Sequence, residues 1–437
     1  MIWLRKVFLY DGRSLREGKW DLLLEKGSVT KLVPSESNSL QEEDVFYDLE
    51  GLVACPGFID LHAHLRDPGQ TWREDIYSGS LAAAAGGFTH VVAMPNTTPA
   101  VDEPSIVRYV AEKGGVAGGA RVLPSGAVTL KREGRRITEM LAMKEEGAVL
   151  FTDDGSPVIS AKAMRIALLY LKDVGVPLME HPEELSLSEG GQINEGRVSA
   201  LCGLKGIPRS SEIIGAERAI RLCEETSGRL HLTHISTKEA LEAIRRAKER
   251  GLPITCDVTP HHLLFDEETI LHSAFSSSLK VNPPLRSGED VEALWRGLED
   301  GTIDAIATDH APYHVDEKDV VFEAAPFGIA SLECAVAAVI DRWDRRGRPF
   351  SKERLFELFS TGPGRVIGLE RKLKLGSKAD LTIIDLNLEG KVDVTNWKSK
   401  ARITPYVGFT FKGWPVLTIL EGKIVYNRLK EEVCHAL

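Results

Sequence analysis

The sequence predicts an α/β fold, in which a (β/α)8 TIM-like barrel is accompanied by a small β-sandwich built from both termini. The middle of the chain repeats a unit made of an apolar strand, a polar loop and a helix-length segment. Both ends contain only short β-rich stretches. The loops carry His, Asp or Asn and no Gly-rich phosphate loop, which favours the barrel over a doubly wound open sheet.

The two ends of the chain are alike and differ from the middle. Short β-rich stretches broken by Gly and Asp occur at residues 3–10, 20–25 and 28–33, and again in ADLTIIDL and GWPVLTILEGKIVYN. Such stretches are typical of antiparallel strands. Because neither end is long enough to bury a core alone, we expect residues 1–54 and 369–437 to form one sandwich beside a barrel at residues 55–368.

Seven segments in the middle of the chain are candidate barrel strands, and each ends in polar residues. They are FIDLHAH, FTHVVAMPNT, AVLFTDDG, VPLMEHPE, LHLTHIST, PITCDVTPHH and IDAIATDHAP. Between several of them the apolar residues have helical spacing, for example at residues 237–251. In a (β/α)8 barrel the chemistry lies at the carboxyl ends of the strands, which is where these polar residues fall.

Composition excludes several classes of function. The net charge is −10 and no basic cluster is present, so neither nucleic acid nor an anionic membrane is an expected partner. No apolar run approaches the ~18 residues of a membrane span, and the first residues have no signal-peptide pattern. The six cysteines are scattered, without a paired motif. We therefore expect a cytoplasmic protein that acts on a small molecule.

The segment Asp60-Leu-His62-Ala-His64-Leu-Arg66 offers the first candidate metal ligands. Residues two apart in a strand point to the same face, so His62 and His64 project together. Imidazole pairs with this spacing suit Zn²⁺ and similar divalent ions. On its own the pair is equally well explained by an ordinary polar loop, so the interpretation depends on further ligands.

Ligand-type residues also follow four later strands, at Asp153-Asp154, His181, His234 and Asp309. Five strands that each end in such a residue are hard to obtain by chance, because the chain has only 12 histidines. Three or four ligands for each ion, with one bridging carboxylate, describe a two-metal hydrolytic centre. Spacing alone does not decide whether Asp153 or Asp154 is the bridge. His310 is expected to orient Asp309, not to bind metal.

Taken together, these motifs resemble the amidohydrolase superfamily and, within it, the bacterial type I dihydroorotases. The similarity extends over essentially the whole chain and includes PGFIDLHAHLRDPG, MPNTTP, FTDDGSPV, EHPEELSLSEGGQINEGRVSALCGLKGIPRSSE, HLTHIST, DVTPHHLLF, KVNPPLR and ATDHAP. The resemblance implies a cyclic amidase that reversibly converts N-carbamoyl-L-aspartate to dihydroorotate in pyrimidine (UMP) biosynthesis. It also implies Zn²⁺ as the cofactor, with one or two ions per subunit and two favoured.

The resemblance assigns metal binding to six residues, namely His62, His64, Asp154, His181, His234 and Asp309. His62 and His64 would hold the first ion with Asp309, and the other two histidines would hold the second. Asp154 would bridge the ions, where hydantoinases use a carboxylated lysine. Asp309 would also be the catalytic proton acceptor.

The resemblance also implies that Arg66, Asn96 and Asn282 bind the substrate carboxylate and ring. One motif departs from the family pattern. Dihydroorotases usually carry a substrate-binding His directly after DHAP, whereas this chain continues with Tyr313-His314. Either the Tyr313 hydroxyl replaces that His, or His314 reaches the site through a changed loop path. We favour His314, because a dianionic substrate is bound better by a cation than by a neutral phenol.

Two other functions fit parts of the pattern. A hydantoinase or an allantoinase is disfavoured by LHAHLRDPG and by Asp154 at the position of the lysine. Some type I relatives accompany aspartate transcarbamoylase, so a low-activity structural partner of that enzyme is the second alternative. For the enzyme itself we expect a homo-oligomer.

Overall fold

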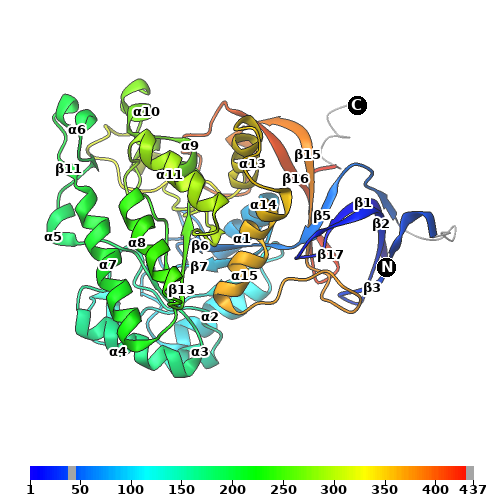
Figure 1. Cartoon of the computed structure of the whole chain (residues 1–437), viewed down its shortest axis with the longest axis horizontal. Helices are drawn as coiled ribbons and strands as arrows, with labels where there is room; N and C mark the ends of the chain where they lie inside the picture. Colours follow the sequence, from blue (N-terminus) through cyan, green and yellow to red (C-terminus); the bar gives the residue numbers. More distant parts are fainter. Residues whose placement is uncertain (38–45, 430–437) are drawn as a thin grey trace.

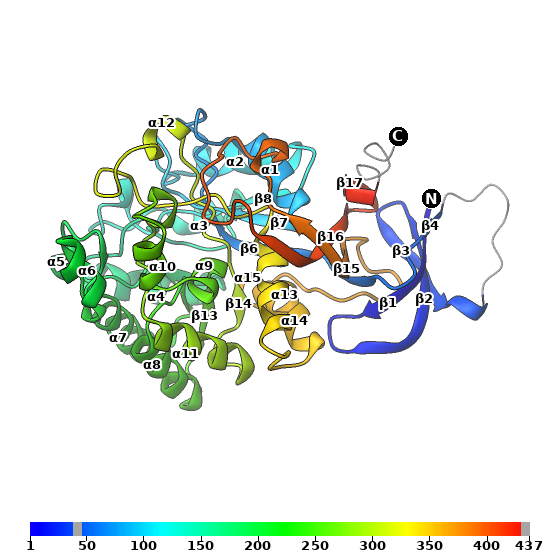
Figure 2. The same ribbon diagram turned by 90° about the horizontal axis from the view of Figure 1, so that it is seen from above.

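The computed structural model describes residues 1–37 and 46–429. Residues 38–45 and 430–437, which belong to the predicted terminal ranges 1–54 and 369–437, lie outside the described residues. A barrel surrounded by helices occupies one end of the molecule, and a separate β-sheet occupies the other (Figure 1). The view from above shows that this sheet contains both the first strands and the last strands of the chain (Figure 2).

The sheet has eight strands in the order β17-β16-β15-β5-β1-β2-β3, with β4 beside β1. Its strands are β1 (Ile2–Tyr10), β2 (Leu15–Glu25), β3 (Ser28–Pro34), β4 (Phe46–Asp48), β5 (Val53–Pro56), β15 (Leu381–Lys391), β16 (Thr410–Leu420) and β17 (Lys423–Asn427). The strands predicted near both ends of the chain are therefore present.

Strand β5 joins the two ends of the chain within this sheet. Its residue Ala54 pairs with Leu9 of β1 in parallel and with Ile383 of β15 in antiparallel register. Leu4, Leu22 and Ile383 belong to one buried apolar cluster that packs on the sheet, so neither terminal segment has a core of its own. The prediction that both termini build one β-structure is confirmed.

The barrel strands are β6 (Phe58–Ala63), β7 (Phe88–Ala93), β8 (Arg121–Pro124), β9 (Leu178–Glu180), β12 (Leu230–Leu232), β13 (Ile254–Val258) and β14 (Ala305–Ile306). All of their pairings are parallel. Single bridges from Phe151 to Gly126 and to Leu178 fill the position between β8 and β9, and a bridge from Ala63 to His310 closes the ring. The predicted (β/α)8 barrel is confirmed.

Two details of the barrel differ from the sequence expectation. Strand β8 was not predicted, because its four residues RVLP lie between Gly-rich and turn-forming residues and are too short for a clear pattern. The segment AVLFTDDG was predicted as a strand, but it contributes only the bridges of Phe151. The barrel is thus complete in topology although one of its eight positions is nearly irregular.

Helices cover the outside of the barrel. They are α1 (Ile76–Ala85), α2 (Pro104–Gly115), α3 (Met140–Glu145), α4 (Ala161–Val174), α7 (Arg209–Thr226), α8 (Lys238–Glu249), α11 (Gly288–Glu299), α13 (Ala335–Arg345), α14 (Lys352–Phe359) and α15 (Thr361–Ile367). Helix α8 shows how the sequence determines the start of such a helix and the face that it buries. The Thr237 hydroxyl accepts from the Ala240 amide at its start, and Leu241, Ile244 and Ala247 bury one face at helical spacing.

Short strands and short helices lie in the loops that follow the carboxyl ends of the barrel strands. They are β10 (Ile193–Asn194), β11 (Gly206–Ile207), α5 (Leu185–Ser188), α6 (Arg197–Cys202), α9 (Pro260–Leu264), α10 (Glu267–His272) and α12 (Val315–Lys318). Ile59, Leu61, Met179 and Ala305 belong to a buried apolar cluster formed by residues of the barrel strands. His64, His181 and His234 lie just beyond the ends of strands β6, β9 and β12. Among the described residues, no helix has the length and apolar character needed to cross a membrane.

Candidate metal centre

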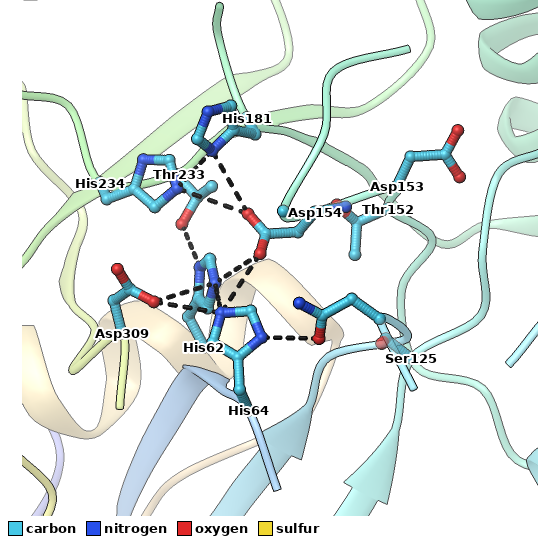
Figure 3. A network of polar contacts seen from close by, with 12 residues as sticks. His62, His64, Ser125, Thr152, Asp153, Asp154, His181, Thr233, His234 and Asp309 are labelled. Atoms are coloured by element: carbon cyan, nitrogen blue, oxygen red, sulfur yellow. Dashed lines mark hydrogen bonds and ion pairs between the residues drawn. The ribbon is translucent and has the colours of Figure 1, made fainter. Parts of the chain in front are cut away.

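His62 lies in β6 and His64 follows its end, and both side chains are buried. Their Nε2 atoms are 3.2 Å apart. Asp154 Oδ2 lies 3.0 Å from His62 Nε2 and 3.4 Å from His64 Nε2, while Asp309 Oδ1 lies 3.2 Å from His64 Nε2 (Figure 3). Four ligand-type side chains from three separate strand ends thus point at one another.

A second pair of histidines faces the other oxygen of Asp154. His181, which follows β9, and His234, which follows β12, bring Nδ1 and Nε2 to 3.0 Å from each other. Asp154 Oδ1 lies 3.6 Å from His181 Nδ1 and 3.4 Å from His234 Nε2 (Figure 3). The carboxylate of Asp154 therefore offers one oxygen to each histidine pair.

These spacings suit bound divalent ions. Ligand atoms at the 2.0–2.1 Å typical of zinc–nitrogen bonds are roughly 3.3 Å from one another in a tetrahedral site. His62, His64 and Asp154 form one group whose ligand atoms lie within 4.8 Å of each other, and Asp154, His181 and His234 form another. The donor set therefore fits two ions that share Asp154.

Hydrogen bonds fix the proton of each imidazole in the first pair. The Thr233 hydroxyl donates to Asp257 at 3.1 Å, so it accepts from His62 Nδ1, which lies 2.8 Å away. His64 Nδ1 lies 2.7 Å from the Asn96 side-chain oxygen and donates to it. Both Nε2 atoms are therefore left with free lone pairs that point toward Asp154, as metal ligation requires.

The second pair is held by fewer contacts. His181 Nε2 donates to the Glu183 carboxylate at 3.1 Å, which leaves its Nδ1 free for a metal ion. Within the described part of the chain, His234 Nδ1 has no hydrogen-bond partner. Its backbone amide donates to Asp257 Oδ1 at 2.6 Å, so the protein fixes the backbone of His234 more firmly than its ring.

The imidazoles keep the two central carboxyl groups ionised. Burial alone would raise the pKa of Asp154, but the close imidazoles of His62, His181 and His234 hold that pKa well below its usual range. Burial is likewise outweighed at Asp309, whose pKa is lowered mainly by its contact with His64. Both side chains are therefore carboxylates at neutral pH and can bind cations.

A cavity of about 380 Å³ opens above these ligands. It is lined by the predicted substrate residues Arg66, Asn96, Asn282 and Tyr313, and by Pro326, Phe327 and Gly328 of a neighbouring loop. Arg66 is buried, forms no ion pair among the described residues and donates from Nε to the Pro312 carbonyl at 3.2 Å. The pocket thus combines metal ligands with an arginine that is available to an anion.

Arg66 reaches the pocket from a loop and not from a strand. Strand β6 ends at Ala63, so strand alternation does not direct Arg66. The backbone of Arg66 has a left-handed φ of 58°, and His234 and Asp309 share this conformation with φ of 41° and 43°. Non-glycine residues adopt it rarely and at a cost, and such strain concentrates at functional sites.

The preference for His314 over Tyr313 is corrected. Tyr313 lines the pocket, whereas the His314 side chain is 47% exposed and does not line it. His314 begins helix α12, where its ring accepts from the Asp316 amide at 3.3 Å. The guanidinium groups of Arg66 and Arg73 lie over the Tyr313 ring, with their carbons 4.8 and 4.6 Å from its centroid.

The structure answers two further questions that the sequence left open, namely which of Asp153 and Asp154 faces the histidines and what His310 contacts. Asp153 turns away from the site and accepts from the Thr129 amide at 2.9 Å, so Asp154 is the residue between the histidines (Figure 3). The expectation that the His310 side chain orients Asp309 is wrong. His310 Nε2 instead lies 3.2 Å from the Glu74 carboxylate.

Sequence reasoning missed the residues that orient the ligands. Glu183 stands two residues after His181, a spacing that could have suggested a partner on the same side of an extended segment. Thr233 and Asp257 lie on different strands, and nothing in one sequence indicates that they meet at His62. Their roles follow only from the folded chain.

Comparisons with known proteins agree with this site. A family model described as "Dihydro-orotase-like" matches residues 51–240. A dihydroorotase of Aquifex aeolicus is 45% identical over 97% of this chain and 99% of the relative, and one of Thermus aquaticus is 42% identical over 98% and 100%. Among solved structures, an L-hydantoinase of Arthrobacter aurescens has a TM-score of 0.85 and 25% identity, covering 98% of this chain and 96% of its own. Since its relatives match at this level over nearly their whole length, the chain belongs to the dihydroorotase family of the amidohydrolase superfamily.

Proposed function

We propose that this protein is a dihydroorotase, which catalyses the reversible ring closure of N-carbamoyl-L-aspartate to dihydroorotate in pyrimidine biosynthesis. The observation that carries the proposal is the position of Asp154 between two histidine pairs, beneath a pocket that contains Arg66. Relatives of 42–45% identity that are named dihydroorotases support the choice of reaction.

The proposed cofactor is Zn²⁺, with two ions in each subunit. His62, His64 and Asp309 would hold one ion, His181 and His234 the other, and Asp154 both. Three kinds of observation support this set: the ligand atoms face one another, three of the imidazoles have their protons fixed outward, and the carboxylates are ionised. When bound, Zn²⁺ supplies Lewis-acid chemistry that polarises an amide carbonyl and lowers the pKa of water.

The substrate would lie in the pocket with a carboxylate against Arg66. A guanidinium can bind a carboxylate through two parallel hydrogen bonds, and Arg66 forms no ion pair among the described residues. Asn282 also lines the pocket, where its Nδ2 donates to Glu183 at 3.5 Å, and it would offer the substrate a further polar contact. Asn96 also lines the pocket, but its oxygen already accepts from His64, so we assign it both to the substrate and to the orientation of this ligand.

Asp309 is the proposed proton carrier. Its carboxylate lines the pocket beside His64 and is ionised at neutral pH, so it can accept a proton from the water that attacks the ring amide. In the hydrolytic direction it then delivers this proton to the departing ring nitrogen. Ring closure follows the same steps in reverse and consumes one proton, because a carboxylate becomes a neutral amide.

Measuring turnover of the purified protein with dihydroorotate, hydantoin and allantoin tests the proposal. We expect turnover with dihydroorotate and with N-carbamoyl-L-aspartate, and none with the two uncharged rings, which offer no carboxylate to Arg66. Preferential turnover of hydantoin or allantoin would instead make the chain a different cyclic amidase. Homo-oligomer formation and association with aspartate transcarbamoylase remain predictions, which the mass of the protein in solution, alone and mixed with that enzyme, will test.

A further inference from the structure

Two lysines near the pocket are almost completely buried. Lys280 is 2% exposed and Lys318 is 1% exposed. Neither forms an ion pair within the described ranges 1–37 and 46–429, and their ammonium groups bond to oxygens of the backbone and of one amide side chain. A buried charge without a counter-ion is costly, so its presence calls for a specific reason.

Lys280 holds the first half of the loop that follows α12. Its Nζ donates to the carbonyl oxygens of Phe322 at 3.0 Å and Glu323 at 2.9 Å, and also to the side-chain oxygen of Gln192. The same ammonium lies 4.9 Å from the centre of the Phe327 ring, which lines the pocket. One cation therefore contacts both the backbone and an aromatic side chain of residues 322–328, which we call the pocket wall.

Lys318 holds the second half of the pocket wall. Its Nζ donates to the Pro326 carbonyl at 2.8 Å and to the Lys280 carbonyl at 3.5 Å. The Gly328 amide donates to that same Lys280 carbonyl at 2.9 Å. The two lysines and their backbone thus bind the wall on both sides of Phe327.

The wall lies close to the segment that follows Asp309. Gly328 has a φ of 128°, and a Cβ at this position would lie 2.6 Å from the Ala311 carbonyl oxygen and 3.1 Å from the Tyr313 ring. A side chain at position 328 would be strained and would clash with Ala311, so the wall can approach the segment after Asp309 this closely only with glycine there. Small displacements of such a wall change the shape of the pocket directly.

Burying two ammonium groups away from water costs free energy, which their hydrogen bonds to the loop must offset. Hydrogen bonds from a charged donor are roughly twice as strong as those between neutral groups. Strong bonds to carbonyls on a segment that has no regular secondary structure of its own are a direct means to fix its position.

We propose that Lys280 and Lys318 are positioning residues, whose ammonium groups hold the pocket wall 322–328 in the shape that binds the substrate. The identity of that substrate rests on the proposed function, but the effect of the lysines on the wall does not. Loss of either ammonium releases the wall, which weakens binding and leaves the chemistry at Asp309 largely intact.

The test compares Lys280→Met and Lys318→Met with a matched control, Lys248→Met. Lys248 also donates to a carbonyl, that of Thr302, and is ion-paired with Asp304, but it lies on α8 and its partners precede β14, away from the pocket wall. Two measurements are made on the full chain loaded with zinc. They are hydrogen exchange of peptides that cover residues 319–328, and the KM and kcat for dihydroorotate.

We expect amide exchange in 319–328 to accelerate roughly 10-fold or more in both lysine variants, as loss of a charged hydrogen bond implies. KM should rise by roughly fivefold or more while kcat stays within about twofold, the pattern of lost ground-state binding. Lys248→Met should change neither quantity. If Lys318→Met does not fold, Lys318→Gln, which keeps a donor without the charge, replaces it.

Wild-type exchange and KM in both lysine variants would overturn the proposal, and so would an equal rise of KM in Lys248→Met. A wild-type protein that does not act on dihydroorotate would contradict the proposed function instead. In that case the exchange of residues 319–328 still decides whether the lysines hold the wall.

Discussion

The two histidine pairs on either side of Asp154 differ in how firmly the protein holds them. His62 is oriented through Thr233 and Asp257, and His64 through Asn96. In the other pair, His181 is oriented by Glu183, while His234 Nδ1 has no hydrogen-bond partner among the described residues.

The charge of the two sides differs as well. Asp154 serves both sides, but Asp309 adds a second carboxylate only beside His62 and His64. A metal ion is bound more tightly by more anionic ligands whose orientation is fixed in advance. The two proposed sites would therefore be unequal although they share Asp154, and we expect the ion at His181 and His234 to be the first to be lost.

Asp154→Asn should have the largest effect, because it damages both sides at once. The amide lacks the charge that attracts either ion, so we expect metal content to approach zero and turnover to disappear. Elemental analysis of the purified variant gives the metal content, and circular dichroism controls for folding. A variant that keeps two ions per chain would remove Asp154 from the bridging role.

Asp309→Asn should damage only the side of His62 and His64. An amide cannot accept the proton at its oxygen as a carboxylate does, so kcat should fall by about 10²–10⁴-fold. The ion at His181 and His234 should remain, which separates this variant from Asp154→Asn. Near-native turnover would show that another group carries the proton.

Glu183→Gln should weaken metal binding only at His181 and His234, and its effect on activity should be smaller than that of Asp309→Asn. The substituted amide can still accept from His181 Nε2 but lacks the carboxylate charge, so we expect metal affinity to fall by about 10-fold, the lower end of the loss typical for the partner of a ligating histidine. Its matched control is Thr233→Val, which removes the contact of His62. Chelator titration of both variants should show loss of the weaker ion from Glu183→Gln and of the tighter ion from Thr233→Val. The reverse order would contradict our ranking of the two sites.

Changes at Tyr313 should leave both ions in place and affect substrate binding by the smallest amount. The guanidinium of Arg66 lies over the ring of Tyr313, and a phenylalanine ring would present the same aromatic face. Tyr313→Phe should therefore keep KM near the wild-type value. Tyr313→Leu removes the ring and should raise KM by roughly 3- to 10-fold. If Tyr313→Phe is as harmful as Tyr313→Leu, the hydroxyl is the group that matters.

Local patterns were enough to predict most of the fold. Apolar periodicity and Gly or Asp turns located the strands at both ends of the chain and the helix α8. Strand β8 was missed because four residues are too few to show alternation. The segment around Phe151 has the composition of a strand, yet its neighbours allow only single bridges, which is a tertiary effect.

In the candidate site, sequence patterns predicted the residues at strand ends but not the directions of loop side chains. Strand ends indicated the candidate ligands, because polar residues at the end of parallel strands meet at one edge of the barrel. The direction of a loop side chain has no such rule. His314 starts a short helix and turns outward, and only the folded loop shows that Tyr313 takes the place beside Arg66.

Activity measured against zinc content tests the central claim most directly. The protein is first stripped of metal with a chelator, and Zn²⁺ is then returned in steps while turnover of dihydroorotate and bound metal per chain are measured. The two unequal sites predict no turnover without metal, ordered filling, and full activity only at two ions per chain. Full turnover of metal-free protein, or a plateau at one ion per chain, would contradict the account.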